Sequence, residues 1–128
     1  MNTSKPIQFG GLTPYVYYKD AGAVADWLVR CFGFVETSRH PAEDGSVQNV
    51  ELTVGSTVLW LDGDLSRTAS NDGPPVWIGV WVDDVDAMYA HTQAVGAASD
   101  PPEDKPYGVR MLTVKDPEGV SWGFIKRI

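Results

Sequence analysis

The hydrophobic positions of this chain follow two spacings, one of two residues and one of three to four. The spacing of two is clearest in VWIGVWV, residues 76–82, which predicts a β-strand because successive side chains of a strand point to opposite faces. One face would carry Val76, Ile78, Val80 and Val82, and the other would carry Trp77, Gly79 and Trp81. The aliphatic face is typical of a core. Two tryptophans around a glycine on the opposite face indicate a second role for this strand.

A strand-to-helix pattern occurs twice along the chain. Residues 13–33 and 77–96 superpose so that Asp20 falls on Asp84, and each aspartate precedes a stretch with helical spacing. An aspartate at this place can accept the free N–H groups of a first helical turn. The predicted apolar stripes are Val24, Trp27, Leu28 and Cys31 in the first helix and Val85, Met88, Tyr89 and Thr92 in the second, and Gly33 and Gly96 end the two helices.

Strand-like patterns follow each predicted helix. They cover residues 34–40, 46–54 and 57–62 in the first half, and 96–100, 108–114 and 120–128 in the second, where a proline-rich loop is predicted at 101–106. Each half is therefore strand, helix and three strands, which is an α+β pattern. One such unit leaves a sheet face uncovered, so two must combine. We expect a single domain over residues 1–128, made of modules at about 11–64 and 75–128 and joined by the polar linker at 62–75.

Four stretches carry a resemblance to a known family: TPYVYYKDAGAVADWLVRCFG, VQNVELTVGSTVLWLD, VWVDDVDAMYAHTQAVGA and EDKPYGVRMLTVKDPEGVSWGF. Together they resemble the vicinal-oxygen-chelate superfamily, and within it the small glyoxalase/bleomycin-resistance-like proteins. The resemblance implies two βαβββ modules whose curled mixed sheets surround a cup-shaped cleft, with the ligand on the concave face. It covers the chain from about Leu12 to Ile128. It is specific for the fold and not for the activity, because this fold hosts many chemistries.

The resemblance also implies where a metal would bind. Metal-dependent members hold a divalent cation on one side chain from the opening strand and one from the last strand of each module. Those positions fall on Thr13, Trp60, Trp77 and Gly123 in this chain, with an uncertainty of one residue at Trp60. Apart from a weak threonine hydroxyl, none of these residue types is a normal ligand for Zn²⁺, Ni²⁺ or Fe²⁺. We therefore expect no metal site and no cofactor.

Strand alternation predicts what lines the cup instead. If the four implied positions point inward, their neighbours two residues away on the same strands point inward too. Aromatic walls of this kind favour flat, apolar or cationic ligands through stacking and cation–π contacts. Two alternatives stay open, namely that the aromatic side chains fill a core without a ligand or that the tryptophans lie in a dimer interface. The predicted ligand-binding residues are Thr13, Tyr15, Tyr17, Trp60, Trp77, Trp81 and Gly123, with Gly79 and Gly123 leaving room between the rings.

Three polar residues complete the predicted binding set. Glu51 lies in a strand that should line the cup, and burial would raise the pKa of its carboxyl enough for it to act as a base or to pair with a cationic ligand. Tyr107 and Arg110 lie in PYGVR, where they offer a phenol and a guanidinium near the cleft mouth. Each of the three could equally be a solvated surface residue. The catalytic residues, if the protein is an enzyme, are not determined by the sequence.

Composition limits the kinds of molecule that the protein can bind and the compartment in which we expect it. The formal net charge of −7 disfavours nucleic acid, because phosphate contacts need a basic patch, and it adds basic ligands to the candidates. The sequence has no run of about 18 apolar residues, so it predicts no membrane span. The first residues also lack the apolar stretch of a signal peptide. A single cysteine, Cys31, excludes an internal disulfide and fits a reducing cytoplasm. We expect a cytoplasmic homodimer that binds a small molecule.

Three functions are compatible with these patterns. The first is a metal-independent protein that binds a small, flat aromatic molecule, with cationic molecules as one option, in the manner of bleomycin-resistance proteins. The second is an enzyme of the same fold, an isomerase, lyase or dioxygenase-like protein, with Glu51 or Tyr107 as general acid or base. The third is a non-catalytic dimeric interaction domain. The missing metal ligands and the aromatic lining favour the first.

Overall fold

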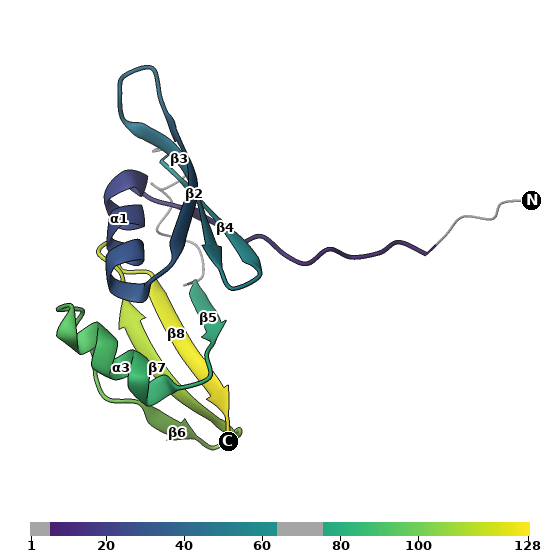
Figure 1. Cartoon of the computed structure of the whole chain (residues 1–128), viewed down its shortest axis with the longest axis vertical. Helices are drawn as coiled ribbons and strands as arrows, with labels where there is room; N and C mark the ends of the chain where they lie inside the picture. Colours follow the sequence, from purple (N-terminus) through teal and green to yellow (C-terminus); the bar gives the residue numbers. More distant parts are fainter. Residues whose placement is uncertain (1–5, 64–75) are drawn as a thin grey trace, which may run out of the picture.

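A computed structural model describes residues 6–63 and 76–128 of the chain, and within them each half forms a four-stranded sheet with one helix (Figure 1). The first module comprises β1 (Tyr15–Tyr17), α1 (Ala21–Phe32), β2 (Val35–Pro41), β3 (Val47–Val54) and β4 (Thr57–Asp62). The second comprises β5 (Trp77–Trp81), α3 (Val85–Ala94), β6 (Glu103–Lys105), β7 (Val109–Lys115) and β8 (Ser121–Arg127). The prediction of two βαβββ modules is confirmed. The predicted linker lies mostly in 64–75, outside the described residues.

The two sheets have the same topology. The strand orders are β1-β4-β3-β2 and β5-β8-β7-β6, so the first strand of each module pairs in parallel with the last, and the other neighbours are antiparallel. We call β1–β4 the first sheet and β5–β8 the second sheet. In each, the connection from the first strand to the second passes through the helix, which covers one face. The opposite face, which we call the open face, is where the predicted aromatic residues lie.

Both helices begin where the aspartates predict. The side chain of Asp20 accepts a hydrogen bond from the N–H of Ala23 at 3.0 Å, and that of Asp84 accepts one from Ala87 at 2.9 Å. The first helix ends at Gly33, whose φ of +81° lies in the left-handed region that favours glycine. These caps fix where each chain segment leaves its first strand and turns back over the sheet.

The second module departs from the prediction between α3 and β7. Residues 96–100, predicted as a strand, form no regular element, and β6 lies instead inside the stretch predicted as a loop. Proline cannot donate a ladder hydrogen bond, so Pro102 and Pro106 limit β6 to the three residues between them. The short strand still forms because it pairs with β7, with Glu103 opposite Met111. An edge strand of this kind is difficult to predict when its sequence is rich in proline.

The helix-facing sides of both sheets meet in one core. Phe32 at the end of α1 lies edge-on to Phe124 of β8 with ring centroids 4.8 Å apart, and Phe34 lies edge-on to Trp122 at 5.6 Å. The aliphatic face of β5 packs against this core from Ile78 onward, whereas Val76 precedes the strand and is exposed. Because aromatic side chains of both modules contact one another here, the modules bury a shared core.

A buried polar cluster joins the same two modules. The hydroxyl of Tyr18 donates to Asp116 at 2.5 Å, and the indole N–H of Trp122 donates to the same carboxylate oxygen at 3.0 Å. The other oxygen accepts the backbone N–H groups of Glu118 and Val120, both at 3.0 Å. Burial, followed by the neighbouring Asp116 carboxylate, raises the pKa of Tyr18 far above its usual value, so its hydroxyl remains a donor.

An extended arm precedes the first strand. Residues 6–14 have no helix or strand and run away from the body of the chain (Figure 1). The arm exposes Ile7, Phe9 and Leu12, whose exposed fractions are 82%, 92% and 89%. Apolar side chains this exposed gain nothing from their own chain, which makes the arm a candidate for contact with another molecule.

Candidate functional site

The strand register places most of the predicted binding residues on the open faces. In the first sheet, Trp60 lies opposite Tyr15 on one side and opposite Glu51 on the other, so the three side chains share a face. In the second sheet, Gly79 lies opposite Gly123, which places the side chains of Trp77 and Trp81 on the same face of β5. The open face of each sheet therefore carries its own aromatic group.

Hydrogen bonds to carboxylates hold the aromatic side chains on the open face of the first sheet. Trp60 donates its indole N–H to Glu51 at 2.8 Å and contacts Tyr15 edge-on, with ring centroids 5.6 Å apart. Tyr15 in turn donates its hydroxyl to Asp62 at 2.7 Å and lies 5.1 Å from the Tyr17 ring. The hydrogen bonds fix the ring orientations, so this face presents ordered aromatic edges beside negative charge.

The carboxyl of Glu51 is a poor general base in this setting. Thr37 donates its hydroxyl to one oxygen at 2.6 Å, and Trp60 donates to the other. These two hydrogen bonds, that of Thr37 first, lower the pKa of Glu51 because they stabilise the charged form by more than its slight burial disfavours it. The expected rise in pKa is therefore wrong. Glu51 is a carboxylate at neutral pH, suited to pairing with a cation.

Trp77 lies flat on the open face of the second sheet. A Cβ atom added at Gly123 would meet Cζ2 of the Trp77 ring at 1.7 Å, and one added at Gly79 would meet its Cζ3 at 2.9 Å. The indole therefore rests on the backbone of both glycines. The room that these glycines were expected to leave for a ligand is filled by Trp77 itself. Trp77 as a residue remains 45% exposed, so a half-open indole shelf covers this part of the sheet.

Trp81 stands farther along the same strand and is 58% exposed. The guanidinium of Arg127 lies over its ring, 4.9 Å from the centroid, which is a cation–π distance. Sequence reasoning missed Arg127, although the alternation that places Gly123 and Ile125 on the open face extends to it two residues later.

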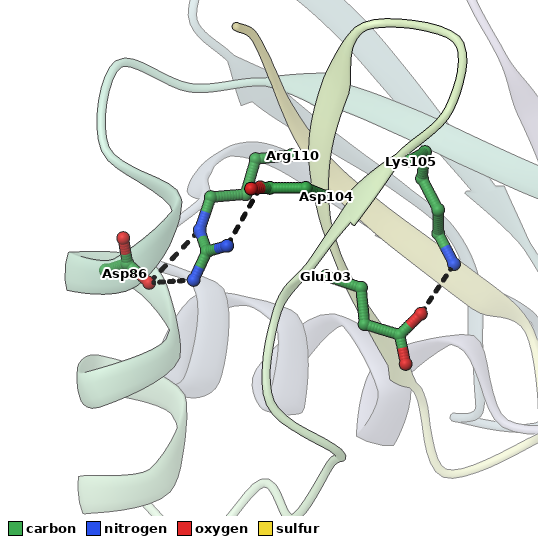
Figure 2. Close-up of polar contacts among 5 residues, drawn as sticks. All are labelled: Asp86, Glu103, Asp104, Lys105 and Arg110. Carbon is green, nitrogen blue, oxygen red and sulfur yellow. Dashed lines mark hydrogen bonds and ion pairs between the residues drawn. The ribbon is translucent and has the colours of Figure 1, made fainter.

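Three predicted residues are not brought to these aromatic groups by any contact. Thr13 is exposed and precedes β1 without belonging to a strand, and Tyr107 is exposed in the turn between β6 and β7. Arg110 points to the helix side of the second sheet, where it pairs with Asp86 of α3 at 2.8 Å and Asp104 of β6 at 2.9 Å (Figure 2). These carboxylates raise the pKa of Arg110 above its usual value. Its guanidinium therefore has a structural partner on each side.

Two cavities adjoin the unpaired edge of β5, with volumes of about 320 and 430 Å³. Val54 and Gly55 at the end of β3 line both, as do Val80 and Trp81 of β5. Their mainly apolar walls extend the surface around Trp81 toward the first module. Tyr15, Glu51 and Trp60 line neither of them, so the two aromatic groups do not share these cavities.

The residues at the family's metal positions do not fit a metal ion. The indole N–H of Trp60 is a donor already bound to Glu51, and the Trp77 indole lies across Gly123, which has no side chain to offer. Thr13 would be left as a single weak ligand. Within residues 6–63 and 76–128, no group of three or more His, Cys, Asp or Glu side chains is placed to hold a metal ion.

Comparison with known proteins identifies the family. Residues 10–124 match the model of the Glyoxalase/Bleomycin resistance protein/Dioxygenase superfamily. The chain belongs to this superfamily. The resemblance of the sequence and the fold it implied are thereby confirmed. In the part of the chain that the structure describes, no helix is both long enough and apolar enough to cross a membrane.

Individual relatives add detail. An uncharacterized protein of Mycobacterium bovis is 31% identical over 120 residues, covering 87% of this chain and 79% of the relative. The crystal structure of TioX from Micromonospora sp. ML1 superposes with a TM-score of 0.77 at 32% identity, over 94% of this chain and all of that one. TnmS3, an antibiotic binding protein from Streptomyces sp. CB03234, gives a TM-score of 0.70 at 25% identity over the full length of both chains.

Proposed function

We propose that this protein is a metal-independent binder of small molecules and that it holds a flat aromatic ligand against the indole of Trp77. The Trp77 shelf carries the proposal. Its ring is pressed onto two glycines, which fixes its orientation, and its outward side is open. A ring that is already immobilised loses little entropy when a second ring stacks on it, and such contacts contribute about 1–3 kcal/mol each.

The acidic groups on the open face of the first sheet support cationic members of this ligand class. Glu51 carries full charge at neutral pH and lies directly beside Trp60, and Tyr15 and Asp62 form a second pair of ring and carboxylate. An aromatic cation would gain stacking and charge attraction at the same face. The likeness to TnmS3, which is described as an antibiotic binding protein, agrees with small-molecule binding.

A quenching titration tests the proposal. Acridine and 9-aminoacridine are flat three-ring molecules of the same shape, the first neutral and the second cationic at pH 8. We expect both to quench tryptophan emission. The Trp77→Leu variant should weaken acridine by about tenfold through loss of the stack, whereas 9-aminoacridine, which can also stack on Trp60 beside Glu51, should be weakened less. Trp27→Phe, a change on α1 beside Phe32, is the matched control and should leave both affinities unchanged. Equal affinity in wild type and Trp77→Leu contradicts the proposal.

The metal content of the purified protein tests metal independence. The protein, purified without chelator or immobilised metal, is dialysed against Ni²⁺, Zn²⁺, Mn²⁺ or Fe²⁺, and its metal content is determined. We expect much less than one retained metal per chain and unchanged affinity for acridine, because Trp60, Trp77 and Gly123 replace the family's ligands. One tightly held metal per chain would overturn this part of the proposal and favour an enzyme.

The same chain is proposed to act as a homodimer. The arm over residues 6–14 exposes Ile7, Phe9 and Leu12, and the aromatic groups on the open faces are half exposed, so a second copy would remove apolar surface from water. Sedimentation should show a dimer, and removal of residues 1–12 should weaken it. A wild-type chain that sediments as a monomer at all concentrations contradicts this part.

A further inference from the structure

The open faces of the two sheets carry opposite charges. Beside the aromatic side chains of the first sheet lie the carboxylates Glu51 and Asp62. On the same face as those of the second sheet lie Arg127, over the Trp81 ring at the end of β8, and Lys115, at the end of β7. No carboxylate among the described residues forms an ion pair with either cation. The second sheet therefore offers positive charge near its indole shelf.

A hollow of about 640 Å³ lies on this face, over β6 and β7. Its floor includes Met111, Thr113 and Lys115 of β7, and the segment 98–101 forms part of its wall. This volume is within the range of small-molecule sites. Its side chains offer a hydroxyl, a thioether and an ammonium group, which can bind a polar substituent rather than a bare hydrocarbon.

The strand register connects the hollow to the Trp77 shelf. Thr113 lies opposite Gly123, on which the Trp77 ring rests, and Lys115 lies opposite Ser121, the partner of Trp77 on β5. Lys115 is therefore two strands from Trp77 in the same row, roughly 10 Å between Cα atoms. A lysine side chain is long enough to span part of that gap, so a substituent on a ring stacked on Trp77 can extend toward the hollow.

The charges of the hollow separate into a neutralised pair and two single groups. Lys105 donates to Glu103 at 2.9 Å, which cancels both charges (Figure 2). Lys115 remains as a cation, and Asp100 belongs to the wall formed by segment 98–101. A negatively charged substituent would be attracted by the first and repelled by the second, so these two residues have opposite predicted effects.

We propose that this hollow is an anion subsite, in which Lys115 and the hydroxyl of Thr113 bind a carboxylate or similar oxyanion carried by the aromatic ligand. The inference rests on the proposed function, since the aromatic part of the ligand occupies the Trp77 shelf. It adds a class of ligand, aromatic acids and aromatic zwitterions, that the acidic first sheet alone would not predict. Ammonium-to-carboxylate hydrogen bonds are among the stronger polar contacts in proteins.

The experiment compares acridine-9-carboxylate with acridine, two probes of the same ring system that differ by one negative charge. Their dissociation constants are measured for wild type, Lys115→Gln, Asp100→Asn and Lys126→Gln. Lys126 is the matched control, because it lies on β8 opposite Arg110 and so points to the helix side of the same sheet. We expect Lys115→Gln to weaken the carboxylate about fivefold and Asp100→Asn to strengthen it, with acridine unchanged in both. Lys126→Gln should leave the ratio of the two affinities unchanged.

Two outcomes overturn the inference, and they are distinct from failure of the proposed function. If Lys115→Gln and Lys126→Gln change the carboxylate affinity equally, the effect is the overall charge of the protein and the hollow is no subsite. If acridine binding depends on Trp77 but neither Lys115→Gln nor Asp100→Asn changes the affinity for acridine-9-carboxylate, the Trp77 shelf is supported and the anion subsite is wrong. If no probe binds the wild-type protein, the shelf and the subsite both fail.

Discussion

The two modules place their tryptophans differently, although their strands follow one topology. When Asp20 is superposed on Asp84, the cross-strand pair Tyr15 and Trp60 of the first sheet corresponds to the pair Gly79 and Gly123 of the second. The aromatic pair at this place packs edge-on, with the Trp60 N–H held by Glu51. The glycine pair leaves a bare floor onto which Trp77 folds. The residue size at this register position therefore decides whether the neighbouring tryptophan can lie on the sheet backbone.

The modules also differ in charge. The first surrounds its rings with carboxylates, whereas the second has Arg127 over Trp81 and Lys115 near Trp77. Since the strand topology is shared, the difference resides in a few side chains of the open faces. Such faces can diverge without cost to the core, because they take no part in the packing between the modules. The following predictions test this division, from the largest expected effect to the smallest.

The largest effect is expected where the modules are joined. Asp116→Ala would leave the Tyr18 hydroxyl, the Trp122 indole N–H and two backbone N–H groups without their acceptor in a buried place. We expect the free energy of unfolding, measured with urea, to fall by about 3 kcal/mol. Asp116→Asn, which keeps an acceptor oxygen, should recover part of the loss. A change below about 1 kcal/mol for the alanine variant would mean that the shared aromatic core alone holds the modules together.

Much of this arrangement could be predicted from the sequence because it is local. Alternation along residues 76–82 separates Trp77 from the core, and Asp20 and Asp84 mark the helix starts through hydrogen bonds to residues three positions away. What could not be predicted depends on pairings between distant strands. The flat position of Trp77 requires Gly123, 46 residues later, to lie beside Gly79, and strand alternation alone does not fix that register.

The position of Arg110 shows the same limit. A family-like loop suggested that it reaches the cleft, but its direction is set by Asp86 and Asp104, which approach it from α3 and β6. The presence of β6 was itself hidden by the prolines around it. The position of Arg127 on the open face follows from alternation along β8, but its contact with Trp81 depends on the pairing of β8 with β5, which alternation alone does not fix.

The next largest effect tests the glycine floor directly. Gly123→Ala places a methyl group where the Trp77 ring lies, so the indole must leave the sheet while every tryptophan is retained. We expect acridine affinity to fall by about tenfold, near the loss for Trp77→Leu, because an indole without its floor is no longer fixed. Gly119→Ala would be a poor control, because Gly119 has a φ of +89° that strains any side chain. Ser121→Ala, on the same strand and face, adds no atom beneath the Trp77 ring and should retain binding.

A smaller effect is expected in the first module when the charge beside the Trp60 ring is removed. Glu51→Gln keeps an oxygen that can accept from Trp60 but removes the charge. We expect 9-aminoacridine to bind about threefold more weakly, within the range for a partly exposed charge, and acridine to be unaffected. Isothermal titration of the two probes measures the difference. Equal weakening of both probes would indicate that Glu51 acts only by holding Trp60, and the charge difference between the modules would then not bear on ligand choice.

The smallest effect is the pH dependence of the bond between Trp60 and Glu51 in the first module. Hydrogen bonds from Thr37 and Trp60 lower the pKa of Glu51 in the folded protein, so its contribution to stability is present above the pKa of an unfolded glutamate and is lost as the pH falls through the lower, folded value. The indole N–H resonance of Trp60, assigned with Trp60→Phe, should therefore shift only below the usual range of glutamate titration, and in Glu51→Gln it should not follow that titration. The Trp77 resonance is the internal control, since its ring lies on glycine backbone rather than on a carboxylate. A Trp60 shift within the ordinary glutamate range would mean that the two hydrogen bonds do not persist in solution, and the ordered ring edges that distinguish the first module from the second would be lost with them.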